Sequence, residues 1–78
     1  MNKTKKTLVD TKLLEKIIKE SGLKKKRIAE LLNLSPYSLS KKIRNENEFL
    51  LSEIACLCSI LHLSPEMRER IFFTLCVD

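Results

Sequence analysis

Apolar residues recur at helical spacing from Leu13 to the end of the chain, and no stretch of useful length alternates as a strand does. Polar or turn-forming residues interrupt this pattern at Ser21-Gly22, at Asn33-Leu34-Ser35, over residues 44–48 and at Ser64-Pro65. The interruptions divide the chain into five helical segments. The pattern therefore predicts an all-α fold of five helices.

Capping residues mark the ends of the first two helices. Asp10 or Thr11 is a good N-cap for the first helix, and Gly22, the single glycine, suits its C-terminus because glycine tolerates positive φ. The second helix runs from about Lys25 to Leu32. Asn33 then takes the left-handed position that commonly ends a helix.

The capping signals at the starts of the last three helices differ in strength. Ser35 is an N-cap and Pro36 fits the first helical position, so a short third helix is expected from Pro36 to about Ile43. The fourth helix covers about Leu51–Leu61 and has no clear capping residue. Ser64-Pro65-Glu66 opens the fifth, which carries Met67, Ile71, Phe72 and Leu75.

The apolar positions of the first four helices predict the core. The expected inward residues are Leu13, Leu14, Ile17, Ile18, Ile28, Ala29, Leu31, Leu32, Leu39, Ile43, Ile54, Leu57, Cys58 and Leu61. On the third helix, Leu39 and Ile43 face inward. Its polar positions, including Lys41 and Lys42, and Arg44 beyond it are expected to face outward.

Seventy-eight residues correspond to one small domain. Residues 1–9 are expected to be a flexible basic arm, and residues 10–78 the folded domain. No run approaches the roughly 18 apolar residues of a membrane helix, and no apolar segment follows the first lysines as in a signal peptide. We expect a cytoplasmic protein with no membrane contact and no room for a ligand-sensing domain, hence no small-molecule ligand.

The net charge of +5 is unevenly distributed. Residues 1–45 hold 13 Lys/Arg and 4 Asp/Glu, whereas residues 46–78 hold 2 and 6. Positive charge concentrated in one half of a chain favours a polyanionic partner, although a solvated lysine-rich surface would show the same charge.

The second and third predicted helices are joined by only three residues, Asn33 to Ser35. Two short helices joined this way cross steeply and form a helix-turn-helix, here between about Lys24 and Ile43, whose second helix enters the major groove of DNA. Ala29 is small enough to allow close approach, and Leu34 fills the turn. The outer face of the third helix offers hydroxyl, phenol and ammonium groups, which read base edges and bind phosphate.

The stretch SGLKKKRIAELLNLSPYSLSKKIRN, residues 21–45, resembles the Cro/repressor (XRE-like) helix-turn-helix family of phage and bacterial regulators. NEFLLSEIACLCSILHLSPEMRERIFF, residues 47–73, is similar to the remaining two helices of that five-helix domain, especially in small phage- and prophage-encoded members. The sequence departs from the family at Asn33, where a glycine is usual, and at Lys24, where a threonine or serine cap is usual.

The resemblance implies a DNA-binding surface, residue by residue. Lys25 would meet a phosphate; Pro36, Tyr37, Ser38 and Lys41 would lie at the base edges; Arg44, Asn45 and Asn47 would follow the sugar-phosphate backbone. It also implies a transcriptional regulator, a phage or prophage repressor, that binds operator double-stranded DNA as a homodimer. The apolar residues Phe72, Phe73 and Leu75 are expected at the dimer interface.

Catalytic and metal-binding alternatives have little support in the sequence. His62 is the only histidine, no nucleophile has a partner at motif spacing, and no glycine-rich phosphate loop exists. Cys58 and His62 are four residues apart on one helix face, so a metal pair is conceivable, but no CxxC motif accompanies them. We expect neither an enzyme nor a cofactor, and the odd count of three cysteines favours a reducing compartment.

Two other functions remain open. A protein-interaction module, such as an antirepressor or an antitoxin-like partner, would use the acidic second half and the apolar tail, but would not need the basic first half. An RNA-binding module would need aromatic residues among the lysines for base stacking, and Tyr37 is the only one there.

Overall fold

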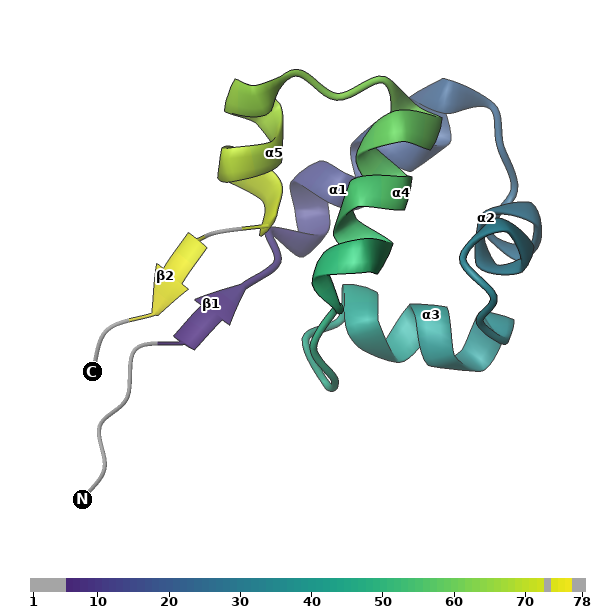
Figure 1. Ribbon diagram of the computed structural model, residues 1–78, viewed down its shortest axis with the longest axis horizontal. Coiled ribbons are helices and arrows are strands. Elements are labelled where there is room, and N and C mark those ends of the chain that lie inside the picture. Colours follow the sequence, from purple (N-terminus) through teal and green to yellow (C-terminus); the bar gives the residue numbers. More distant parts are fainter. Residues whose placement is uncertain (1–5, 73, 77–78) are drawn as a thin grey trace.

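Five helices and a two-stranded ribbon follow one another in the computed structural model, which describes residues 6–72 and 74–76. The helices are α1 (Thr11–Ser21), α2 (Lys25–Leu31), α3 (Pro36–Ile43), α4 (Leu51–Leu61) and α5 (Pro65–Phe72) (Figure 1). The strands are β1 (Lys6–Leu8) and β2 (Thr74–Cys76). The five-helix, all-α domain expected from the sequence is confirmed, and α3 and α4 have the predicted bounds.

The predicted caps of α1 are present. The Asp10 carboxylate accepts a hydrogen bond from the Leu13 amide at 3.1 Å and so satisfies one of the free donors at the helix start. Gly22 ends the helix at φ +81°. Because a β-carbon is strained at this φ, the single glycine lies where its freedom is needed.

The turn between α2 and α3 also follows its sequence signals. Asn33 has φ +64°, which is the left-handed conformation expected for it. The Ser35 hydroxyl accepts from the Ser38 amide at 3.0 Å, and Pro36 occupies the first turn of α3. Lys24 makes no side-chain cap for α2, as its identity implied, and α2 ends at Leu31, one residue before the expected end.

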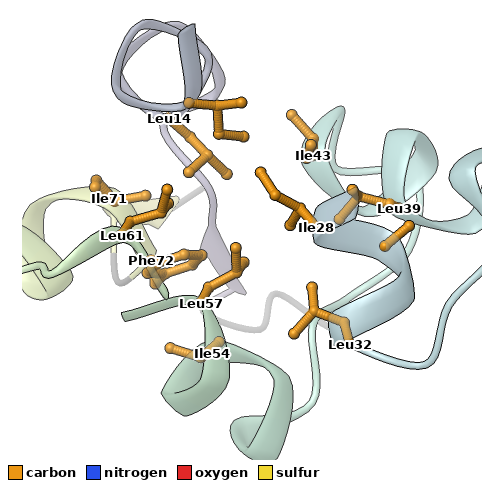
Figure 2. Packing of buried hydrophobic residues seen from close by; sticks show 12 residues of the cluster. Leu14, Ile28, Leu32, Leu39, Ile43, Ile54, Leu57, Leu61, Ile71 and Phe72 are labelled. Carbon is orange, nitrogen blue, oxygen red and sulfur yellow. The ribbon is translucent and has the colours of Figure 1, made fainter. Parts of the chain in front are cut away.

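Buried side chains from all five helices form one core (Figure 2). Its members are Leu14, Ile18, Ile28, Ala29, Leu32, Leu39, Ile43, Ile54, Leu57, Leu61, Ile71 and Phe72. Phe49, in the loop before α4, packs edge-to-face on Phe72, with ring centroids 5.6 Å apart. Of the residues expected to face inward, Leu13, Ile17 and Cys58 are half-buried and Leu31 is exposed.

The ribbon corrects two expectations about the chain ends. Leu75, predicted on the fifth helix, lies in β2, because α5 ends at Phe72 and the chain then pairs antiparallel with β1. The Asp10 amide also donates to the Ile71 carbonyl at 2.7 Å, which holds the two ends of the domain together. Residues 6–8 of the expected arm are therefore a strand, while residues 1–5 lie outside the described residues.

The ribbon projects from the helical body, on the side away from α2 (Figure 1). Within the described part of the chain, no helix is long and apolar enough to cross a membrane.

Candidate nucleic-acid interface

Helices α2 and α3 are fixed against each other by a tight turn and by complete burial of their facing residues. The Leu34 amide donates to the Ala29 carbonyl at 2.8 Å, which closes the turn directly onto α2. Ala29 and Leu39 have no exposed surface, and Leu39 lies near Ile28 in the core view (Figure 2). A side chain as small as alanine at position 29 permits this approach, so the outer face of α3 is held rigidly relative to α2.

Three predicted base-contacting residues begin the outer face of α3. Pro36 and Tyr37 are exposed, Tyr37 to 69%, and Ser38 is half-buried. The Ser38 hydroxyl accepts a hydrogen bond from the Ser35 hydroxyl at 3.0 Å. It keeps its own O–H for donation, so this serine can still bond a base or a phosphate.

Lys41 lies one helical turn after Tyr37, and the two side chains are in contact. The Lys41 ammonium is 5.4 Å from the centroid of the Tyr37 ring, a cation–π arrangement. A lysine packed on an aromatic ring loses less freedom when it binds a ligand than one that moves freely. Two of the predicted base-contacting residues, Tyr37 and Lys41, are therefore brought together on one face of α3.

The predicted phosphate contact at the start of α2 has an acidic neighbour. Lys25 Nζ is 2.8 and 2.9 Å from the two carboxylate oxygens of Glu15 on α1. Both side chains remain substantially exposed, at 42% and 39%. A cation at a helix N-terminus is unfavourable because it opposes the helix dipole. The Glu15 carboxylate offsets this unfavourable charge of Lys25.

The cation after α3 is paired in the same way. Arg44 Nε is 2.9 Å from a carboxylate oxygen of Glu46, and the two side chains are 52% and 49% exposed. The Glu46 amide donates to the Lys41 carbonyl at 2.8 Å, so the backbone of Glu46 is anchored to the end of α3. The sequence alone predicted neither of these carboxylate partners, Glu15 and Glu46.

Lys42 does not face outward as expected. Its ammonium is 2.6 Å from Glu53 of α4, and the two side chains are only 13% and 10% exposed. The same Glu53 oxygen accepts from the Leu50 amide at 2.9 Å and supplies the cap that the start of α4 lacked in the sequence. Lys42 therefore belongs to the packing between α3 and α4.

The structure gives Asn45 an internal role. Its side-chain oxygen accepts from the Val9 amide at 2.8 Å, and its amide nitrogen donates to the Val9 carbonyl at 2.9 Å. Thr11 adds a bond from its hydroxyl to the Ile43 carbonyl at 2.6 Å. The side chain of Asn45 thus joins the end of α3 to the segment before α1, and its backbone is left-handed at φ +67°.

Cys56 and Cys58 lie on α4, apart from this surface. Burial raises the pKa of the Cys58 thiol, partly opposed by the Arg68 guanidinium, so the thiol stays protonated at neutral pH. The Cys56 sulfur is 3.7 Å from the Leu31 carbonyl. Among the described residues, no three His, Cys, Asp or Glu side chains are close enough to share a metal ion.

These features define the class of protein. Two short helices joined by a tight turn, the second with an exposed polar and cationic face, form a helix-turn-helix DNA-binding domain. The family model for the Cro/C1-type HTH DNA-binding domain matches residues 13–66, and the chain belongs to that family. The match runs from α1 into α5 and leaves both strands outside it. Neither curated proteins nor solved structures match the chain significantly.

Proposed function

We propose that this protein is a transcriptional regulator, a phage or prophage repressor, that binds operator DNA in the cytoplasm through the outer face of α3. The observation that carries the proposal is the exposed reading face itself, on which the Lys41 ammonium lies 5.4 Å from the ring of an exposed tyrosine, in a Cro/C1-type domain. The proposed activity is binding without catalysis and requires neither a cofactor nor a small-molecule ligand.

Each outer residue has a role that follows from its chemistry. Lys41 donates to guanine O6 and N7, and Tyr37 and Ser38 offer hydroxyl donors to bases or phosphates. Pro36 has no donor and contributes apolar contact, for example with a thymine methyl group. Lys25 and Arg44 bind phosphates. Asn45 is left out of this set because its amide is bonded to Val9.

We also propose that the protein binds a two-fold operator as a homodimer, since one short recognition helix reads only a few base pairs. Phe72 does not supply the interface, because it is 3% exposed and packs on Phe49 in the core. The side chains of Phe73 and Leu75 lie outside the described residues. Sedimentation of the protein alone and with operator DNA should give a dimer on DNA. A single protomer on an undivided site would refute this proposal.

Selection of bound duplexes from a random library tests the main proposal. We expect the selection to enrich a two-fold motif. The affinity for this motif should fall with salt, with a log–log slope that corresponds to about 4–8 neutralised phosphates per dimer. The measurement for the second part is fluorescence anisotropy over a salt series. Absence of enrichment together with absence of binding at low salt would overturn the proposal.

One observation favours a second function. Leu31, Leu50 and Leu51 are exposed to 43%, 61% and 76%, and Leu50 and Leu51 are adjacent in the chain. A regulator that acts by binding another protein would use such residues. The same selection decides between the two functions, because an interaction module would enrich no duplex.

A further inference from the structure

Both cations that the proposed interface uses for phosphate are already bound to carboxylates. Lys25 is paired with Glu15 across α1 and α2, and Arg44 with Glu46 just after α3. All four side chains are between 39% and 52% exposed. Pairs this accessible to water contribute at most about 1 kcal/mol, so a phosphate can displace either carboxylate.

We propose that Glu15 and Glu46 limit the affinity of this protein for DNA of any sequence by competing with phosphate for Lys25 and Arg44. This inference rests on the proposed function. When a phosphate takes over the cation, the carboxylate stays within a few ångströms of the DNA backbone, because its own helix or turn holds it there. Like charges placed together oppose association, so each carboxylate weakens binding at every site.

The backbone around Glu46 supports this assignment. Asn45 has a left-handed backbone, and the Glu46 amide donates to the Lys41 carbonyl. The backbone of Glu46, and with it the base of its side chain, is therefore held in place just beyond the end of α3. A carboxylate near a helix C-terminus is unfavourable for the helix dipole. Stability of α3 therefore gives no reason for an acid here, whereas competition with phosphate does.

Glu15 supports it from the other end of the motif. It lies on α1, three residues after the exposed Lys12 and four before the exposed Lys19, so it shares a helix face with two cations. The carboxylate nevertheless directs both oxygens at Lys25. The charge of Lys25 is thereby offset in the free protein. The attraction of this end of the helix-turn-helix for DNA phosphates is then weaker than the basic charge of the first half of the chain would suggest.

The buried pair Lys42–Glu53 makes a useful contrast. Its side chains are 13% and 10% exposed, so no phosphate reaches Lys42 without unfolding the contact between α3 and α4. Among the three pairs at or beside the proposed interface, only Lys25–Glu15 and Arg44–Glu46 are exposed enough to exchange partners. The limit on affinity is thus assigned to Glu15 and Glu46 and not to Glu53.

The test compares Glu15→Gln, Glu46→Gln and Glu30→Gln with the wild-type protein. Glu30 is the matched control, because it also forms an exposed pair, with Arg27 at 3.3 Å, but Arg27 is not in the proposed interface. Affinity for the selected operator and for an unrelated duplex is measured by anisotropy from low to moderate salt, and circular dichroism checks folding. All variants keep a side chain of the same size at an exposed position, so they should fold.

We expect Glu15→Gln and Glu46→Gln each to strengthen binding to both duplexes about fivefold at low salt. Each should also steepen the log–log salt dependence by about one, because one more phosphate is neutralised without compensation. Glu30→Gln should change both quantities much less. The equal effect on both duplexes identifies an influence on phosphate binding rather than on base choice.

Three results would overturn the inference. If the two variants bound DNA as tightly as the wild-type protein, the carboxylates would have no effect on affinity. If they bound more weakly, the carboxylates would help to position the cations. In both cases the proposed function would stand. An equal gain in Glu30→Gln would show an effect of net charge alone, with the same consequence. Absence of duplex binding by the wild-type protein and all variants would overturn the inference and the proposed function together.

Discussion

Lys42 and Arg44 are two residues apart at the end of α3, and each is paired with a carboxylate, yet the two pairs have different consequences. The pair Lys42–Glu53 is about nine-tenths buried, whereas Arg44–Glu46 is about half exposed. Removing one member of a buried pair leaves an uncompensated charge in the protein interior. Removing one member of an exposed pair leaves a charge that water solvates. Burial, and not position along α3, separates the cation that stabilises the fold from the one that remains available to the proposed interface.

The largest effect is expected at Glu53. Replacing it by alanine strands the Lys42 ammonium and leaves the Leu50 amide without its acceptor. We expect a loss of about 3 kcal/mol in the free energy of unfolding, measured by urea denaturation. Glu46→Ala is the matched change in the exposed pair and should cost less than about 1 kcal/mol.

A second variant at this site separates charge from capping. Glu53→Gln keeps an oxygen for the Leu50 amide and removes only the charge, so it should be more stable than Glu53→Ala. It also remains measurable if the alanine variant does not fold. Equal stability losses in Glu46→Ala and Glu53→Ala would show that burial does not separate the two pairs.

The next effect concerns the neighbouring lysines of α3. Lys41 lies on Tyr37 at the outer face, and Lys42 is buried against Glu53. Lys41→Ala should weaken binding at the preferred operator by about 1–3 kcal/mol and relax base choice, with unfolding unchanged. Lys42→Ala should instead lower stability. Fluorescence anisotropy with operator variants measures affinity, and urea denaturation of both proteins measures stability. If Lys41→Ala lowered stability and Lys42→Ala lowered affinity, the outer face of α3 would have been assigned to the wrong lysine.

A smaller effect is expected at Asn45, which the sequence placed in the DNA interface and the structure places in the fold. Asn45→Gly keeps the left-handed backbone and removes the bonds to Val9, so it should cost about 1 kcal/mol of stability. Asn33→Gly is its control: Asn33 is also left-handed, and its side chain has no partner among the described residues. That change should leave stability nearly unaltered. The thermal midpoints of the two variants report the difference, and equal midpoints would contradict the role given to the Asn45 amide.

The smallest effect on the fold is expected at Lys25. Lys25→Ala breaks only the exposed pair with Glu15, so the loss of stability should stay below about 1 kcal/mol. Binding should weaken nearly equally for all duplexes, and the salt dependence should fall by about one. Altered base preference in this variant, measured by repeating the duplex selection, would place Lys25 at the base edges instead.

The sequence was sufficient for features that depend on neighbours in the chain. The Asp10 cap, Gly22, Asn33 and the Ser35-Pro36 start of α3 each act within three or four residues, so their signals are local. Helical periodicity likewise gave the bounds of α3 and α4. Local signals therefore predicted the five helices and, apart from Lys42, the outer face of α3.

Contacts between distant parts of the chain could not be predicted. Asn45 and Val9 are 36 positions apart, and Lys42 and Glu53 are 11 apart. Nothing in one sequence says which of several outward lysines meets which glutamate. The Glu53 side chain, three residues after Leu50, is the one missed feature with a local signal, because Glu at that position often caps the helix start.

The pairing of β1 with β2, and the bond from the Asp10 amide to the Ile71 carbonyl, also govern the order of folding. These contacts join the first and the last described segments, so they form only after nearly the whole domain has been synthesised. Contacts between such distant segments carry the cost of closing a long loop and form late. The α2–α3 turn closes on local bonds, but Ile71 and Phe72 complete the core beneath it. A nascent chain that ends before α5 therefore holds α3 on an unfinished core, and the helix-turn-helix becomes stable only after α5 has been synthesised.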